Sequence, residues 1–441
     1  MPPFHSRAAI VSIGDELSLG QNLDTNSKWL AERLMRLGII TLEHVTVGDD
    51  EALTAESFSR LARRADVLIS TGGLGPTLDD LTRQSLARVL REPLVTDDDA
   101  LHTLQARFAA RGRTVPDLQR AQAARPATAR MLPNPNGTAP GLHAVLTTSP
   151  AHATDVFCLP GPPGEMKPMF ESHVLPALCP PHGRRASTRF IHLAGIGEGD
   201  AAARLGSLMD RARMPIVGIT ASGGILTCRV RYEGSDDDAA VRSKIDETVS
   251  AIRHVLGPHI FGQADDTIMT AVLAELASRN ETLASVESCT GGMLGQIITD
   301  APGASRVYLG GLVTYSNDLK AALADVPRDL IAAHGAVSEP VARAMALGGL
   351  HRSGAARCLA ITGIAGPHGG TPAKPIGTVF ISLASRRDHA PADVLVRHFA
   401  FTGQRADIRQ RAATTALVML LFELRGSLSG LNLLWQVPAG A

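Results

Sequence analysis

The sequence predicts an α/β protein of three parts. These are an N-terminal open, mostly parallel sheet with helices on both faces, a small α+β middle domain and a C-terminal α/β domain. Short apolar runs alternate with segments of helical periodicity through the first 180 residues, which is βαβ patterning. Glycine-rich turns follow several of these runs. The 441 residues, 44% hydrophobic and 20% charged, suffice for two or three cores of ordinary size.

The N-terminal elements are expected to alternate along the chain. Apolar or β-branched runs predict strands, and leucines near helical spacing before a glycine predict helices. The expected strands are 8–13, 41–47 and 66–70, and the expected helices are 26–37, 52–65 and 78–90. Two turn-rich segments, 134–141 and 159–166, bracket a further pair of strands. Ligands of such sheets bind at the carboxyl ends of the strands, so the loops there are the place to seek a site.

The domain boundaries follow breaks in periodicity. Proline, glycine and adjacent cations at 179–185 predict a linker. The glycines of 195–199 lack the G-x-G-x-x-G spacing of a nucleotide fingerprint, so we interpret them as structural. The last domain is expected to open with a helix at 265–279 and to end with a long helix at 404–424. The resulting domains are 1–180, 186–262 and 264–426, followed by a tail at 427–441.

Composition excludes several classes of protein. The 43 basic and 43 acidic residues balance, so no global field recruits nucleic acid or an anionic membrane, and neither is expected as a partner. Five scattered cysteines without C-x-x-C spacing argue against a disulfide framework or zinc knuckle and favour a reducing cytoplasm. We recognise no export signal, and the longest late apolar run, 416–422, is too short to span a bilayer.

A candidate nucleophile lies early in the last domain. A β-like run at 282–286 leads into Ser288 and Cys289, and we expect both at a helix start where free N–H groups and the helix dipole favour negative charge. Serine needs a base to remove its proton, and Tyr315 with Lys320 could supply that relay. Singly, these residues have plainer interpretations: Ser288 as a helix N-cap, Tyr315 as a packing residue and Lys320 as a solvated cation.

Other residues near this motif leave alternatives open. Cys289 could itself be the nucleophile if the helix start lowers its pKa, although free cysteines are often simply buried. The Gly- and Pro-rich loop 366–375 either covers the site or is a plain connection, and His368 within it is not expected to be a catalyst. Three arginines open the last helix, where one could reach a phosphate, although solvated cations are commoner: Arg405, Arg409 and Arg411.

Glycines and acids carry the N-terminal chemistry. Gly14, Asp15 and Glu16 follow the first strand, and 71–75 follows the third. Glycine N–H groups can approach phosphate oxygens while carboxylates hold a bridging divalent cation. Asp79 and Asp80 are the candidate metal ligands, although they could merely complement a helix N-terminus.

Together with the motif Ile361–Pro367, the C-terminal pattern resembles the CinA family (competence/damage-inducible protein A). The resemblance implies deamidation of nicotinamide mononucleotide to nicotinate mononucleotide and ammonia, in NAD recycling, by a cofactor-free domain. It implies catalytic roles for Ser288, Tyr315 and Lys320. It also places residues in substrate binding, namely Cys289, Thr290, Gly291, Gly292, Asn317, Thr362 and Gly363.

The N-terminal motifs resemble the molybdopterin-binding, MoaB/MogA-like domain of the same family. This implies a metal-dependent ADP-ribose pyrophosphatase that yields AMP and ribose 5-phosphate. The implied substrate-binding residues are Gly14, Asp15, Glu16, Asn26, Thr71, Gly72, Gly73, Gly75, Gly137, Thr138 and Gly161. Molybdopterin binding or adenylylation stays an alternative, as does a non-catalytic nucleotide or pterin sensor linked to competence or DNA damage. The resemblance further implies a KH-like middle domain and a homodimer.

Overall fold

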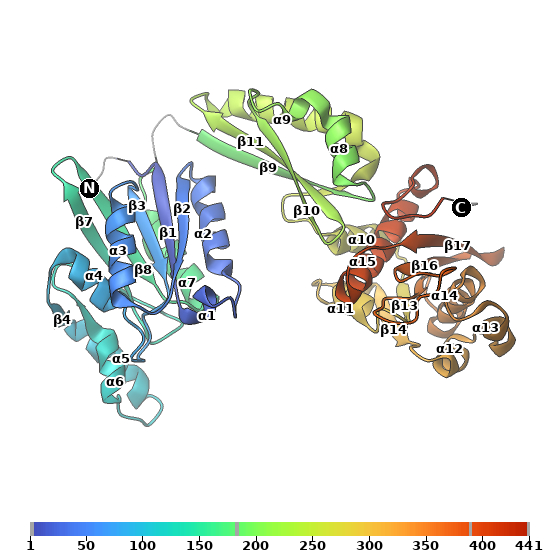
Figure 1. Cartoon of the computed structure of the whole chain (residues 1–441), viewed down its shortest axis with the longest axis horizontal. Coiled ribbons are helices and arrows are strands. Elements are labelled where there is room, and N and C mark those ends of the chain that lie inside the picture. The colour runs from blue at the N-terminus through green and yellow to red at the C-terminus, as the bar shows by residue number, and fades with distance from the viewer. Residues whose placement is uncertain (1–3, 181–184, 388–389, 439–441) are drawn as a thin grey trace. The chain divides into compact units, whose positions relative to one another are not determined.

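A computed structural model describes residues 4–180, 185–387 and 390–438. The chain divides into two compact units, one of Met1–Ser187 with Tyr232–Val241 and one of Thr188–Arg231 with Arg242–Ala441 (Figure 1). The expected linker at 179–185 lies partly outside the described residues. No helix of the described ranges is both long and apolar enough to cross a membrane.

The N-terminal domain is built on a six-stranded, mostly parallel sheet. Its first four strands are parallel, whereas the last two run antiparallel to their neighbours. The carboxyl ends of the four parallel strands therefore meet at one edge. The strand order is β2 (Ile40–Val47), β1 (Arg7–Ile13), β3 (Val67–Thr71), β8 (His152–Leu159), β7 (Gly141–Ser149) and β6 (Arg130–Leu132).

Helices cover both faces of this sheet. Strand β1 shows why its sequence is continuously apolar: Ala8 and Ile10 point into one core, and Ala9 and Val11 point into the other. Helices α2 (Thr25–Arg36) and α7 (Pro163–Met169) pack into the first core. Helices α3 (Glu51–Ala62) and α4 (Thr82–Leu90) pack into the second.

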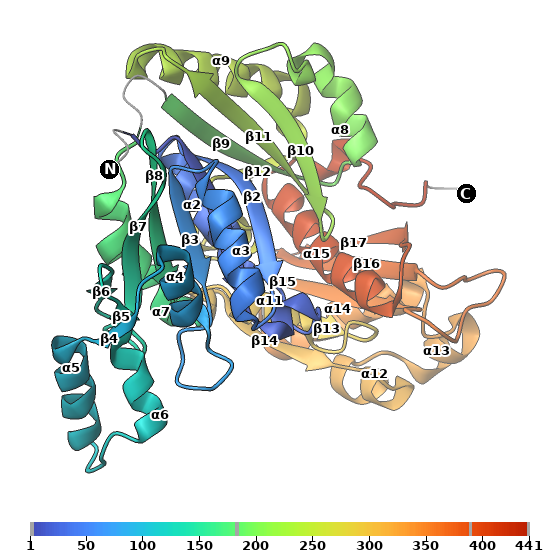
Figure 2. The ribbon, with the colours of Figure 1, turned by 60° about the vertical axis from the view of Figure 1, so that its left-hand side comes forward.

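A helical excursion leaves this domain between two short paired strands. Figure 2 shows α5 and α6 standing off the main sheet. The elements are β4 (Leu94–Thr96), α5 (Asp98–Ala109), α6 (Asp117–Arg120), the 3₁₀ turn η1 (Ala121–Ala123) and β5 (Ala124–Pro126); the short helix α1 (Asp15–Ser18) follows β1.

The middle segment forms a small four-stranded sheet with helices α8 (Glu198–Leu205) and α9 (Asp238–Leu256). Within its glycine cluster, Gly195 has φ +73°, and a Cβ there would lie 2.7 Å from Leu433 Cδ2. Close packing thus accounts for this glycine. The strand order is β10 (Ile216–Ser222), β11 (Ile225–Gly234), β9 (Arg185–Ala194) and β12 (Ile260–Gln263).

The C-terminal domain has a five-stranded mixed sheet. Strand β13 (Leu283–Glu287) is parallel to both of its neighbours, so the carboxyl ends of three strands meet. Strands β15, β16 and β17 are antiparallel to one another in turn. The order is β14 (Tyr308–Val313), β13, β15 (Arg357–Gly363), β16 (Thr378–Arg387) and β17 (Ala390–Ala400).

Helices again cover both faces of this sheet. Helices α10 (Ile268–Ser278), α11 (Met293–Thr299) and α15 (Arg405–Leu424) share one core, which also takes in Leu433 of the tail and Phe261 of the middle sheet. The other core contains residues of α12 (Asn317–Ala324), α13 (Arg328–His334) and α14 (Glu339–Ser353). The middle sheet and the C-terminal domain thus bury apolar surface in common.

Candidate functional site

The C-terminal site assembles where β13 and β14 end side by side. Ser288 follows β13 directly and opens a turn that runs to Gly292, where Gly291 and Gly292 have φ of +58° and +94°. Such angles suit glycine because it has no Cβ. Lys320 comes from α12, which begins shortly after β14. Parallel pairing of the two strands therefore brings residues 32 positions apart to one place.

Ser288 and Lys320 form a buried pair. Lys320 Nζ lies 2.9 Å from Ser288 Oγ and donates to the Thr314 carbonyl oxygen at 3.0 Å. Lys320 is only 1% exposed, and burial lowers its pKa because a low-dielectric surrounding disfavours the ammonium form. No carboxylate of the described ranges forms an ion pair with it. Lys320 is therefore not a solvated cation. A lysine amine in its neutral form, held at this distance from a hydroxyl, is able to accept the hydroxyl proton.

The expectation that Ser288 sits at an open helix start is wrong. Helix α11 begins at Met293 with Gly292 as its N-cap, so Ser288 does not cap it either. The buried carboxylate of Glu287 accepts hydrogen bonds from the N–H groups of Gly292, Leu294 and Gly295 at 3.1, 2.9 and 2.8 Å. The positive end of the helix is therefore already occupied by a negative charge of the protein, and its dipole does not serve the serine.

Cys289 is packed in the hydrophobic core beside the pair, where its thiol lies near enough to Lys320 to interact with it electrostatically. It is 7% exposed, and burial raises the pKa of its thiol to about 12. A thiol with such a pKa is protonated at neutral pH and is a poor nucleophile. The next residue, Thr290, is fully buried, and its carbonyl oxygen accepts from Arg409 Nη2 at 2.6 Å. Arg409 thus supports the turn that follows Ser288.

Tyr315 lies at the surface and contacts an arginine instead of the pair. Its side chain is 58% exposed, and its hydroxyl accepts from Arg405 Nη2 at 2.9 Å. Arg405 Nη1 also donates to the Gly366 carbonyl oxygen at 2.6 Å, so this arginine joins the Tyr315 segment to the glycine-rich loop. Within the described residues no hydrogen bond connects Tyr315 to Ser288 or Lys320.

The remaining C-terminal candidates occupy supporting positions. Asn317 is the exposed first residue of α12. Thr362 is buried and donates to the Ala336 carbonyl oxygen at 2.8 Å, and a Cβ at Gly363 would lie 2.6 Å from Val379 Cγ2. Arg411 lies over the Trp435 ring, with its Cζ 4.8 Å from the centroid. His368 is exposed.

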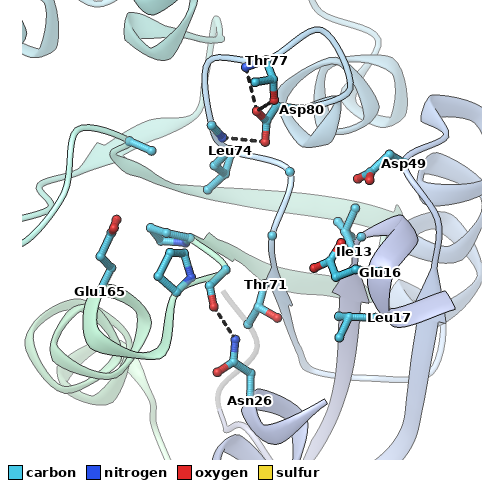
Figure 3. Close-up of a pocket in the computed structure, with 18 of the residues that line it drawn as sticks. Ile13, Glu16, Leu17, Asn26, Asp49, Thr71, Leu74, Thr77, Asp80 and Glu165 are labelled. Carbon is cyan, nitrogen blue, oxygen red and sulfur yellow. Dashed lines mark hydrogen bonds between the residues drawn. The ribbon is translucent and has the colours of Figure 1, made fainter. Parts of the chain in front are cut away.

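The N-terminal candidates converge on a cavity of about 630 Å³ at the carboxyl ends of β1, β3 and β8 (Figure 3). Gly72 shows why glycine is needed there: at φ +101°, a Cβ would lie 2.1 Å from the Ile13 carbonyl oxygen. Gly137 instead lines a neighbouring cavity, and Asp15 lines neither. The predicted residues that do line the cavity are Gly14, Glu16, Asn26, Thr71, Gly72, Gly73, Gly75, Asp79, Asp80, Thr138 and Gly161.

Asp79 and Asp80 do not start a helix, contrary to expectation, because α4 begins at Thr82. The carboxylate of Asp80 accepts from the N–H groups of Gly75 and Thr77 at 2.7 and 2.8 Å and from the Thr77 hydroxyl (Figure 3). Asp80 therefore braces its own loop, and the N–H of Gly75 is not free for a phosphate. Asp79 is exposed, and its hydrogen bond with Thr77 lowers its pKa.

The cavity is strongly acidic. No Lys, Arg or His side chain lines it among the described residues. The Asp49 carboxylate accepts a hydrogen bond from the N–H of Asp15 at 2.9 Å. Burial and the nearby charges of Asp15, Asp79 and Glu16 raise the pKa of Asp49. Figure 3 places Glu165 across the cavity from Asp49 and Glu16. The carboxylates of the lining come from Glu16, Asp24, Asp49, Asp79, Asp80 and Glu165.

A cation-rich or cation-bridged ligand suits this donor set. Carboxylates are the ligands that hard divalent cations prefer, and the mutual repulsion at Asp49 would be relieved by one. Among the described residues, however, no three His, Cys, Asp or Glu side chains converge as a ready-made metal site. Asp49 and Asp79 fit the role of metal ligands, and Asp80 does so less well because its oxygens are already engaged.

Sequence reasoning missed several residues of the two sites. Glu287 could have been found from the sequence, because it is the one charged residue in its strand. All five residues of that strand, Leu283–Glu287, are buried. Asp49, Glu165 and Gln122 also line the N-terminal cavity. Nothing in their local sequence distinguishes them from solvated polar residues, since elements far apart in the chain bring them together.

Comparison with known proteins agrees with this architecture. Family models match the probable molybdopterin binding domain at residues 9–179, the damage-inducible protein CinA KH domain at 188–262 and the CinA C-terminal domain at 265–424. The molecule is therefore an α/β protein that combines a molybdopterin-binding type of domain with a CinA C-terminal domain. A putative competence-damage inducible protein of Symbiobacterium thermophilum is 42% identical over 96% of this chain and 99% of its own. The chain belongs to the CinA family.

Two further relatives illustrate the range of similarity. A CinA-like protein of Geobacter metallireducens is 39% identical over 93% of this chain and 97% of its own. The crystal structure of a competence/damage inducible protein from Agrobacterium tumefaciens is 34% identical and covers 36% of this chain and 93% of its own, with a TM-score of 0.34.

Proposed function

We propose that the C-terminal domain is an amidohydrolase that deamidates nicotinamide mononucleotide. The observation that carries the proposal is the 2.9 Å contact between Ser288 Oγ and the buried, pKa-lowered Lys320 Nζ. Serine becomes a useful nucleophile only beside a base, and a desolvated lysine is such a base. The substrate itself is taken from the family resemblance.

The first half of the reaction forms a covalent intermediate. Neutral Lys320 takes the proton of the Ser288 hydroxyl while Oγ attacks the carboxamide carbon, giving a tetrahedral intermediate with a negative oxygen. That oxygen needs hydrogen-bond donors, a role that we assign to backbone N–H groups of the turn after Ser288. The Thr314 carbonyl oxygen holds Nζ in place during both steps, since it accepts a hydrogen bond from an N–H of the amine.

The second half releases the products. Lys320, now an ammonium, returns its proton to the amide nitrogen as the carbon–nitrogen bond breaks, so ammonia leaves and an ester on Ser288 remains. Water then attacks the ester carbon, with its proton passing to Lys320, and Ser288 departs as the alcohol after taking that proton back. The product is nicotinate mononucleotide, and no metal or cofactor enters.

Ammonia release tests this proposal. The purified chain is incubated with nicotinamide mononucleotide, and both ammonia and nicotinate mononucleotide are measured. Equal amounts of the two products are expected. Failure to form either product at millimolar substrate would contradict the proposal.

We propose a second activity, the cleavage of ADP-ribose to AMP and ribose 5-phosphate in the N-terminal cavity. Six carboxylates and, among the described residues, no basic side chain line this cavity, so a diphosphate is expected to enter only together with a cation. When bound, a divalent cation would neutralise the phosphates and polarise the bond to be broken. Asp49 and Asp79 would hold it. Asp80 keeps the 74–80 loop in shape through its hydrogen bonds with the loop backbone.

The rival for this cavity is binding without catalysis, of a nucleotide or of molybdopterin. Purified protein with ADP-ribose and Mg²⁺ or Mn²⁺ separates the two. AMP formation supports the hydrolase, whereas tight binding of ADP-ribose without AMP formation supports the binding protein.

A further inference from the structure

Gln122 is a buried glutamine at the wall of the N-terminal cavity. It lies in η1, at the end of the helical excursion, and is 1% exposed. It lines the cavity together with Thr77 of the 74–80 loop and Thr138. No part of the proposed phosphate or metal chemistry uses it.

The carboxamide oxygen of Gln122 has no hydrogen-bond partner among the described residues. This Oε1 is also shielded from solvent. Leaving such a group unsatisfied is costly, so buried amides normally have partners. Gln122 therefore places an unpartnered acceptor at the wall of the cavity.

A second carboxamide of the cavity has the same property. Asn26 Nδ2 donates to the Gly161 carbonyl oxygen at 2.7 Å, which fixes the side chain, while its Oδ1 is shielded and without a partner in the described ranges (Figure 3). The wall of the cavity therefore contains two neutral carboxamide oxygens without a partner among the described residues, in addition to the carboxylates. Such groups are suited to the uncharged parts of a ligand.

We propose that Gln122 recognises the heterocycle of the ligand, through an edge that carries an amino group beside a ring-nitrogen acceptor. This rests on the proposed nucleotide-binding role of the cavity. A carboxamide is planar, with one acceptor and one donor side by side, and it pairs with such an edge of adenine through two hydrogen bonds. The terminal torsion of glutamine is soft, so the amide can turn its oxygen or its nitrogen toward the cavity.

Adenine and an aminopteridine both have this edge. Their binding affinities distinguish which of the two the cavity recognises. Calorimetric titration of the full chain in the presence of Mg²⁺ uses three ligands: AMP, purine riboside 5′-monophosphate, which lacks the amino group, and 6-hydroxymethylpterin. Wild-type protein is expected to bind AMP about tenfold more tightly than purine riboside 5′-monophosphate. Preference for the pterin instead would identify an aminopteridine as the natural ligand.

Gln122→Leu is the test variant and Gln119→Leu its matched control. Gln119 lies on the same excursion, also has a shielded Oε1 without a partner in the described chain, and does not line the cavity. Gln122→Leu should bind AMP and purine riboside 5′-monophosphate equally, or lose its pterin affinity by about tenfold, whereas Gln119→Leu should keep the wild-type preference.

Three results would overturn the proposal. One is equal wild-type affinity for AMP and purine riboside 5′-monophosphate without pterin binding. The second is an equal effect of both glutamine variants, and the third is no binding of any ligand at millimolar concentration. The wild-type comparison needs no variant to fold. If ADP-ribose is not cleaved but the AMP preference persists and depends on Gln122, the hydrolase proposal fails and this one stands.

Discussion

The two candidate sites differ in where their charge lies. The C-terminal site is built around one buried lysine, which contacts Ser288 and a carbonyl oxygen and has no ion-pair partner among the described residues. The N-terminal cavity holds six carboxylates and no basic side chain in the described lining. The C-terminal site thus has a basic group of the chain itself beside a hydroxyl, whereas the acidic cavity is expected to need a cation that comes with the ligand.

Replacement of Lys320 should cause the largest loss of deamidase activity. Lys320→Met removes the base but keeps an apolar side chain of similar length in the core, so deamidase kcat should fall by about a thousandfold while the fold persists. Lys320→Arg should be equally inactive, because a guanidinium does not lose its proton. The measurement is ammonia release at saturating substrate, with Lys167→Met as control. Activity within tenfold of wild type in either Lys320 variant would show that Lys320 is not the base.

Chelation of metal ions should inhibit the N-terminal reaction and leave the C-terminal reaction unchanged. With EDTA, ADP-ribose cleavage should fall by at least about a hundredfold, because the acidic cavity then repels the diphosphate. Deamidation in the same sample should be unchanged. Asp79→Asn should reproduce the chelator effect on the N-terminal reaction alone. If EDTA leaves AMP formation intact, the metal proposal fails, and if it stops ammonia release, the two sites are not chemically distinct.

The pH dependence of deamidation should follow the ionisation of Lys320. Burial lowers the pKa of Lys320 below the ordinary 10.5, and only its neutral form is the base. Deamidase kcat/KM should therefore rise with pH, by up to about tenfold per unit, and level off above the lowered pKa. Unfolding breaks this environment and restores the higher pKa, so the folded state also loses stability as pH falls through the window between the two values. A rate that falls with rising pH across this window would exclude a neutral lysine base.

Tyr315→Phe should have the smallest effect. The hydroxyl contacts Arg405 and not the Ser288–Lys320 pair, so its removal should raise KM by about three- to tenfold and change kcat little. Steady-state kinetics with nicotinamide mononucleotide separates the two constants. A selective loss of kcat comparable with that of Lys320→Met would return Tyr315 to the proton relay.

The sequence predicts the elements best where one local signal is strong. The last helix, predicted at 404–424, is Arg405–Leu424, because Asp407 caps its start at Gln404 and a mostly apolar stretch, Ala412–Phe422, is buried in the core. The apolar runs at 8–13 and 66–70 likewise match β1 and β3 within a residue at each end. These segments are buried on both faces, so their pattern has one interpretation.

The sequence predicts less where one local pattern has two outcomes. Acids beside a glycine loop can start a helix or brace the loop, and only the hydrogen bonds of Asp80 decide between them. Ser288 was correctly placed after a strand, but the helix start was wrong because Glu287 occupies the N-terminus of α11. Gln122 could not be found, since its role depends on the cavity it reaches and not on its neighbours in sequence.

Ser288, and not the adjacent Cys289, is expected to be the nucleophile that Lys320 activates. The most direct measurement is ammonia release from nicotinamide mononucleotide by Ser288→Ala and Cys289→Ala side by side, with circular dichroism to confirm that both fold. Ser288→Ala should lose essentially all activity, whereas Cys289→Ala should keep most of it, because the thiol is buried with a pKa of about 12. An active serine variant beside an inactive cysteine variant would contradict the account.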